Sequence, residues 1–360
     1  MALMFVFVCW TPYQVFNAVN FVANDVEGSR GNTDIYIYHE FRNSEVISER
    51  LKASGVFAHV YDIDRYDKKR VWYSKFNKIK RLLMPYSTIR KYLRADIDVR
   101  KQGYKTLVIS GNNLFSVNMY NCIQDLKVYF IDDGNGSYFG DLRYNGMTPI
   151  YRLFNKVFHR GPMSYKVEKF YVNNKEICKA TICDTIVQLP TITPGSEVEE
   201  KLNFIFSYEE NSFYKEKKFI YLTQPLSGTE FGESASEVEN SLLSALKDKV
   251  VVRVHPLQKH EAYAEYEVDT TNNLWELECA TQIKDDHVLI GWFSTAQFIP
   301  KMIFHVEPTV VFTYKLYEKI LDEADETVGR LREIYTNPEK IVVLEDLADL
   351  QNLVENMEVE

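Results

Sequence analysis

The sequence predicts an α/β protein made of two Rossmann-like domains that face a central cleft. Short runs rich in Val, Ile, Tyr and Phe alternate with longer segments of helical spacing, which is typical of parallel sheets with crossover helices. The chain has 360 residues, and a single core stops growing at about 250–300 residues. We therefore expect one domain at 1–190, a linker region at 191–215, and a second domain at 216–360 that ends in helices.

The order of the elements supports this division. Buried-strand runs are expected in the first domain at 3–8, 34–38, 59–63, 106–110 and 128–131. Proline and small polar residues at 189–196 then break every periodicity and mark the linker. Further strand runs follow at 219–222, 250–254, 288–290 and 309–312. The leucines of 341–360 step by three residues, which predicts one amphipathic helix.

Composition excludes several classes of protein. The net charge of −9 disfavours general nucleic-acid binding. The five cysteines form no C-x-x-C pair, which indicates reduced thiols in a cytoplasmic protein. The apolar N-terminus is expected to be a buried strand rather than a signal peptide, and no run of 18 apolar residues predicts a membrane span.

One segment departs from the acidic average. Residues 68–105 carry 13 Lys or Arg against two Asp, a local charge of +11, interleaved with aromatic and large apolar side chains. Three interpretations stay open for it. They are peripheral contact with the inner face of the cell membrane, a groove for an anionic acceptor glycan, and a solvated helical face.

Two polar motifs follow strands of the first domain, where ligands of open α/β sheets gather. Gln14, in Thr11-Pro12-Tyr13-Gln14, begins a helix whose free N–H groups suit an anion or a sugar hydroxyl. Asp132 and Asp133 end an apolar strand before Gly134. One carboxylate can be structural while the other accepts a proton from a hydroxyl, although an ordinary Asx turn explains the motif equally well. No further His or acid lies nearby, so no metal site is expected.

Two more motifs follow strands of the second domain. His255 ends one strand, and Pro256 holds its imidazole where it could donate to a leaving phosphate. Ser294 and Thr295 stand at a predicted helix N-terminus, which binds phosphate well. A structural histidine and simple N-capping are the alternatives. Together the four motifs predict a hydroxyl nucleophile with its base, and a leaving phosphate with its acid and its anion site.

In order and spacing, the four motifs resemble those of bacterial sialyltransferases of the glycosyltransferase family 52 type and of the related bacterial polysialyltransferases. Those enzymes share T-P-x-Q, D/E-D/E-G, H-P and S-S/T motifs and have the GT-B fold. The resemblance implies an inverting, metal-independent transfer of sialic acid from CMP-sialic acid to a sugar hydroxyl such as terminal galactose. It also implies a place in capsular polysaccharide or lipo-oligosaccharide synthesis, where the oligosaccharide acceptor is commonly lipid-linked. No cofactor is implied beyond the donor.

The resemblance also implies roles for single residues in catalysis. Asp133 is the candidate general base, and His255 is the general acid or hydrogen-bond donor to the departing CMP. Within the family the base can also come from an acid upstream of the H-P motif, which makes Glu230 the alternative to Asp133.

The binding residues follow from the same resemblance. The first domain would take the acceptor and the second the nucleotide sugar, with Ser294 and Thr295 on the phosphate. Gly134 would allow close approach of the donor, and Glu276 or Glu278 would bind the cytidine ribose. The remaining candidate substrate contacts are Gln14, Asp132 and Pro256.

Two other functions stay open on the sequence. One is a GT-B glycosyltransferase that uses another nucleotide sugar. The other is a non-catalytic glycan-binding assembly subunit. A second copy of the chain, forming a homodimer, is a further partner that the sequence allows.

Overall fold

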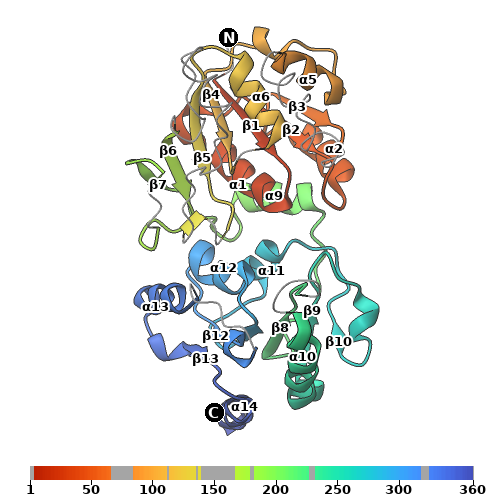
Figure 1. The fold of residues 1–360 in the computed structure, drawn as a ribbon, viewed down its shortest axis with the longest axis vertical. Helices are drawn as coiled ribbons and strands as arrows, with labels where there is room; N and C mark the ends of the chain where they lie inside the picture. The colour runs from red at the N-terminus through yellow and green to blue at the C-terminus, as the bar shows by residue number, and fades with distance from the viewer. Residues whose placement is uncertain are drawn as a thin grey trace. The chain divides into compact units, whose positions relative to one another are not determined.

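Two compact units, Met1–Ser207 and Tyr208–Glu360, make up the chain (Figure 1). The computed structural model describes residues 4–65, 84–111, 113–134, 137–138, 167–178, 182–226, 232–317 and 324–359. Each unit is built on one sheet, and every described strand pair within the two sheets is parallel. The prediction of two Rossmann-like α/β domains is therefore confirmed.

Unit 1 has a seven-stranded sheet in the order β3-β2-β1-β4-β5-β6-β7. Its strands are β1 (Phe5–Cys9), β2 (Thr33–Tyr38), β3 (His59–Ile63), β4 (Thr106–Ile109), β5 (Lys127–Ile131), β6 (Val167–Val172) and β7 (Ile186–Gln188). Its helices are α1 (Pro12–Ala23), α2 (Ser44–Ser54), α5 (Pro85–Tyr92), α6 (Leu114–Cys122) and α9 (Glu197–Phe206). The order of the strands reverses between β1 and β4, which is where ligands of such sheets bind.

Aromatic packing around β1 explains part of the surplus of Phe and Tyr. Every residue of β1 is buried. The ring of Phe21 on α1 lies edge-on to Phe5, Phe7 and Tyr171, with centroids 5.7, 5.4 and 4.9 Å apart. Edge-to-face pairs of this kind add to the hydrophobic burial of the rings. They hold α1 against the centre of the sheet.

Unit 2 has a six-stranded sheet in the order β10-β9-β8-β11-β12-β13. Its strands are β8 (Phe219–Leu222), β9 (Val250–Arg253), β10 (Glu267–Val268), β11 (Val288–Gly291), β12 (Thr309–Phe312) and β13 (Ile341–Val343). Its helices are α10 (Gly232–Leu246), α11 (Trp275–Thr281), α12 (Thr295–Phe304), α13 (Ala324–Ile334) and α14 (Leu347–Val359). The order matches that of the first six strands of unit 1, and it reverses between β8 and β11.

The end of the chain differs from the single helix expected for 341–360. Ile341–Val343 form β13, which pairs with β12, and α14 begins only at Leu347. Three consecutive β-branched residues suit a pleated strand better than a helix, because branching at Cβ restricts the side chain in a helix. Leu344 and Leu350 are fully buried, and α14 packs against α10.

The segment expected to be a linker, 191–215, contains helix α9. This helix packs against α1 and α2 of unit 1. Its N-cap is Ser196, whose hydroxyl accepts from the Glu199 N–H, and its C-cap is Ser207 in the left-handed region. The units divide directly after Ser207.

The first part of the basic segment, residues 66–83, lies outside the described residues. In the part that is described, α5 buries Ile89 and three arginines pair with acids. The pairs are Arg90 with Asp96, Arg94 with Glu45 and Asp64, and Arg100 with Asp98. The charge of this part is thus partly balanced within unit 1. None of the helices in the described ranges is long and apolar enough to cross a membrane.

We predict that Gly291→Ala destabilises unit 2. A Cβ at Gly291 would lie 3.0 Å from the carbonyl oxygen of Leu222 and 3.3 Å from the Gln297 side chain, so β8, β11 or α12 must shift. Overpacking of this kind costs about 1–3 kcal/mol. Gly329→Ala is the matched control, because nothing lies within 4 Å of its added Cβ and alanine favours a helix. Urea unfolding of both variants measures the difference, and equal midpoints would contradict the prediction.

Candidate active site

Asp132, directly after β5, is a structural carboxylate. It is completely buried, and its carboxylate accepts hydrogen bonds from the Gly134 N–H at 2.8 Å, from the Asn173 N–H at 3.1 Å and from the Tyr138 hydroxyl. Burial raises its pKa, although these hydrogen bonds lower it. Both carboxylate oxygens therefore bind the chain itself. This role differs from the substrate contact that the sequence suggested.

Gly134 is required by the same turn. Its φ is +89°, a backbone conformation that only glycine adopts without strain. In this conformation its N–H points at the Asp132 carboxylate. The glycine of the D-D-G motif thus fixes the turn that carries Asp133.

Asp133 is the carboxylate of the pair that is available for chemistry. The residue is exposed, and the side-chain amide of Gln14 donates to its Oδ1 at 2.9 Å. Burial raises the pKa of Asp133 to about 7, the Gln14 amide lowers it, and the charge of Asp132 raises it. Together these effects raise the pKa of the Asp133 carboxyl above the ordinary value of an aspartate. A group with such a pKa serves well as a general base.

Gln14 positions Asp133 from the start of α1. The Trp10 N–H donates to Gln14 Oε1 at 2.8 Å, which leaves the Nε2 group to donate to Asp133. Gln14 is 1% exposed, so it is held in place by the helix and the β1–α1 turn. Thr11 caps α1 by accepting from the Gln14 N–H, and Pro12 occupies the first turn. The T-P-x-Q segment thus aligns the candidate base rather than presenting Gln14 to a substrate.

Sequence reasoning missed two asparagines that complete this site. Asn17 of α1 donates to the Asp132 carbonyl at 3.1 Å, and Asn173 after β6 donates to Asn17 Oδ1 at 3.0 Å. Both are buried. The sequence signal for Asn17 was an amide among the apolar residues of the buried face of α1. A buried polar side chain needs hydrogen-bond partners, so this position predicted a contact with another element. For Asn173 the position directly after a strand was the only signal.

A hydroxyl and an amide at the carboxyl end of β4 were also missed. Ser110 Oγ and Asn113 Nδ2 are buried, and neither has a hydrogen-bond partner within the described part of the chain. They follow β4, the strand next to β1 at the point where the strand order reverses. Unpaired buried polar atoms are uncommon and suit a bound hydroxyl compound.

His255 stands in the loop after β9 as a half-buried side chain. Its backbone N–H donates to Thr223 Oγ1 at 2.8 Å, and its Nδ1 accepts from the Leu257 N–H at 3.2 Å. Burial lowers the pKa of the imidazole, which favours the neutral ring. Because Nδ1 is an acceptor, the proton of the neutral ring sits on Nε2. His255 therefore presents a neutral N–H donor, while Pro256 behind it is exposed.

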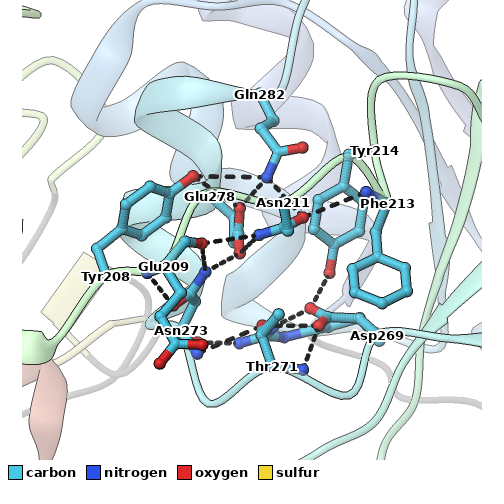
Figure 2. A network of polar contacts seen from close by, with 11 residues as sticks. Tyr208, Glu209, Asn211, Phe213, Tyr214, Asp269, Thr271, Asn273, Glu278 and Gln282 are labelled. Carbon is cyan, nitrogen blue, oxygen red and sulfur yellow. Dashed lines mark hydrogen bonds and ion pairs between the residues drawn. The ribbon is translucent and has the colours of Figure 1, made fainter.

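An ion pair fixes the strand end from which the His255 loop leaves. Arg253 is the last residue of β9 and pairs with buried Asp269. Burial alone would raise the pKa of Asp269, but Arg253 and hydrogen bonds from Tyr214 and Thr271 lower it. Figure 2 shows Tyr214 and Thr271 converging on the Asp269 carboxylate.

Ser294 and Thr295 lie at the N-terminus of the ten-residue helix α12. Ser294 is its N-cap, and the buried Gln297 side chain accepts from the Ser294 N–H at 3.0 Å and donates to the Val311 carbonyl. The Ser294 hydroxyl accepts from the Ala296 N–H at 3.3 Å, so its own proton can still be donated. Both hydroxyl residues are half-buried. This helix N-terminus can bind a phosphate.

Glu278 is enclosed within unit 2. It is completely buried on α11, and Figure 2 shows it at the centre of a polar network. Its carboxylate accepts from Asn211 at 2.8 Å, Asn273 at 2.7 Å, Tyr208 at 3.3 Å and Gln282. All these partners belong to unit 2. The structure therefore corrects the expectation that Glu278 binds the ribose, because both oxygens tie the segment after Ser207 to α11.

Glu276 is the more available of the two glutamates on α11. Burial raises the pKa of Glu276 to about 7, while its own backbone N–H and the charge of Arg253 lower it. No other side chain in the described ranges donates to its carboxylate. Glu230, the alternative base, lies outside the described residues.

Another cluster of titratable groups lies beyond the four motifs. His39, Glu45 and Asp62 bring three ligand atoms within 4.8 Å of one another in unit 1. Lys52 already donates to Asp62 at 2.8 Å, and Arg94 pairs with Glu45 at 2.8 Å. These cations balance the two carboxylates, so the cluster is an ion-pair network.

Comparisons with known proteins agree on the fold. A spinosyn forosaminyltransferase is 10% identical, with 100% of this chain and 91% of that chain covered and a TM-score of 0.56. A Listeria monocytogenes protein assigned as a UDP-N-acetylglucosamine 2-epimerase is 10% identical, with 99% and 89% covered and a TM-score of 0.51. The chain has the GT-B fold.

Two further results complete the comparison. The GT-B domain of a sialyltransferase from Photobacterium damselae is 12% identical, covers 94% of this chain and 99% of its own, and has a TM-score of 0.49. No protein-family model and no curated protein matches the chain. At these identities the similarity shows the GT-B fold alone, and the chemistry must be argued from the chain's own residues.

We predict that Gln14→Leu raises the pKa of Asp133. The variant removes the hydrogen bond that stabilises the charged carboxylate, while burial and the charge of Asp132 remain. Carbon-13 NMR titration of the aspartate carboxyl groups measures the pKa, and Asp133→Asn identifies the resonance. An unchanged or lowered pKa in Gln14→Leu would show that Gln14 does not position this carboxylate.

Proposed function

We propose that the chain is a GT-B glycosyltransferase that transfers sialic acid from CMP-sialic acid to a sugar hydroxyl. Unit 1 would supply the base and take the acceptor, and unit 2 would bind the nucleotide sugar. The proposal rests on the ordered motifs and on the chemistry of the residues that they carry. One observation supports the proposal most strongly. The Asp132 carboxylate is used by hydrogen bonds within the chain, whereas the neighbouring Asp133 carboxylate is accessible and has a raised pKa.

The reaction would be a single displacement. The acceptor hydroxyl oxygen forms a bond to the anomeric carbon, Asp133 takes the hydroxyl proton, and the bond to the phosphate oxygen of CMP breaks. The departing oxygen takes the electron pair. The hydroxyl of Ser294 and the N-terminus of α12 would bind this phosphate, because both present donors to an anion. Attack opposite the leaving group inverts the anomeric centre.

His255 would stabilise the leaving phosphate as a neutral donor. With Nδ1 accepting from Leu257, the Nε2 proton is the one that can point to a ligand. A neutral imidazole loses this proton only at a very high pH, so it acts as a hydrogen-bond donor rather than as a general acid. Glu276, the available glutamate of α11, would bind a ribose hydroxyl.

We predict different effects of two substitutions at His255. His255→Ala should lower kcat by about 10²–10³-fold, the usual effect of removing one donor from a developing negative charge. His255→Gln should stay within about tenfold of the wild type, because the glutamine amide can place an N–H near Nε2. Steady-state kinetics with CMP-sialic acid and lactose measures both variants. If glutamine is as damaging as alanine, His255 acts by proton transfer instead.

We predict that turnover rises with pH through the pKa of Asp133. Below this pKa the carboxyl is protonated and cannot accept the hydroxyl proton, and above it the base is available. Asp133→Asn should lower kcat/KM by about 10²–10⁴-fold and remove this rise, while CMP binding to unit 2 stays unchanged. A pH series of CMP release, with CMP titrated by calorimetry, tests this. Full activity in Asp133→Asn would move the base to another residue such as Glu230.

Another nucleotide sugar is the second candidate donor. The hydroxyls and amides at the start of α12 suit any sugar-nucleotide phosphate. Thermal-shift measurements with CMP, UDP and GDP separate the two, since a ligand at 100 times its Kd adds about 2.7 kcal/mol of stability. Stabilisation by UDP or GDP and not by CMP would overturn the assignment of the donor.

Retained activity in EDTA is expected, in line with the metal-independent transfer that the motifs imply.

A further inference from the structure

A small pocket lies in unit 2 at the carboxyl ends of β8 and β11, where the strand order reverses. Its volume is about 60 Å³, several times the 10–15 Å³ that one water molecule needs. The described residues that line it are aromatic or polar, and those used here are Tyr221, Gln224, Glu239, Gln258, Trp292 and Tyr317. Ligand pockets combine aromatic walls with a few fixed polar groups in this way.

One polar atom of the lining lacks a partner. Gln224 Oε1 is buried, and no group in the described part of the chain donates to it. An unsatisfied buried carbonyl oxygen costs about 1–3 kcal/mol, so its persistence calls for an explanation. A hydroxyl of a bound molecule would satisfy it.

The other polar groups are fixed in orientation by hydrogen bonds. Tyr263 donates to both oxygens of Glu239 at 3.1 and 3.2 Å, and it accepts from Gln258 Nε2 at 2.9 Å. Thr223 donates to Gln258 Oε1 at 2.7 Å. The remaining lone pairs of Glu239 and the second N–H of Gln258 can bind a ligand without any rearrangement.

Charge decides which ligand fits. Glu239 is the one carboxylic acid among the described lining residues, and these include no Lys, Arg or His. A carboxylate without a cation disfavours phosphate and the carboxylate of sialic acid, whereas hydroxyl groups can donate to Glu239 and Gln224. Aromatic walls suit the apolar face of a sugar ring.

The pocket is connected to the candidate active site. Thr223 Oγ1 accepts from the His255 N–H at 2.8 Å and donates to Gln258, so the pocket and the His255 loop share one hydrogen-bond chain. Resting on the proposed function, in which unit 1 holds the acceptor sugar that attacks, we propose that this pocket of unit 2 binds a further neutral hexose ring of the acceptor glycan. Gln224 and Glu239 would set its specificity.

The test measures binding of lactose, a neutral disaccharide, to the full chain without any donor. The NMR titration follows the indole N–H of Trp292, which lines the pocket, so that lactose held by unit 1 does not count. Gln224→Leu and Glu239→Gln should each weaken lactose binding at least tenfold and change CMP affinity less than twofold. Gln224→Leu should unfold at the same temperature as the wild type or higher, because it removes an unpaired polar atom. Glu237→Gln, an exposed position on the same helix, is the control and should bind lactose normally.

The outcomes separate this inference from the proposed function. If lactose does not bind the wild type, or binds both pocket variants with wild-type affinity, the pocket is not a hexose site, whether or not CMP-sialic acid is turned over. If the variants lose CMP rather than lactose affinity, the pocket holds the nucleotide and the inference is wrong. Lactose binding that depends on Gln224 and Glu239 supports it even where another donor replaces CMP-sialic acid.

Discussion

The hydrogen bonds to the buried Asp132 carboxylate are the constraint on which the candidate site of unit 1 depends. They join the turn after β5 to the residue after β6, and Asn17 of helix α1 donates to the backbone carbonyl of the same residue, Asp132. A buried carboxylate is stable only where donors surround it, so this arrangement tolerates little movement. Asp133 gains its position from this rigidity. Because Asp132 makes the hydrogen bonds that hold the turn, the Asp133 carboxylate stays accessible at the edge of the sheet.

Unit 2 uses polar networks of the same kind for another purpose. The network around Glu278 ties the segment after Ser207 to α11, and the Arg253–Asp269 pair fixes the end of β9. Both groups are bonded within unit 2. Both set the positions from which the His255 loop and the helix α12 present their donors. Buried charged groups of unit 2 therefore hold the elements that carry the candidate site residues.

The sequence predicted the fold well because parallel sheets bury their strands, and buried strands are continuous apolar runs. It missed β13 because Ile341–Val343 was merged with the leucines of the following helix. It could not distinguish Glu276 from Glu278, because both are glutamates on one helix. Only in the folded chain do Tyr208 and Asn211 donate to Glu278. The partnership of Gln14 with Asp133 spans 119 positions and arises only when β1 and β5 enter one sheet.

A crystal structure with a non-reactive analogue of CMP-sialic acid tests the central claim most directly. The account predicts the phosphate at Ser294 and the N-terminus of α12, with His255 Nε2 within hydrogen-bond distance of it. It also predicts that the Asp133 carboxylate is the acid nearest the face of the anomeric carbon opposite CMP. An analogue bound elsewhere, or one whose anomeric carbon lies beside Glu230 and away from Asp133, would contradict the account.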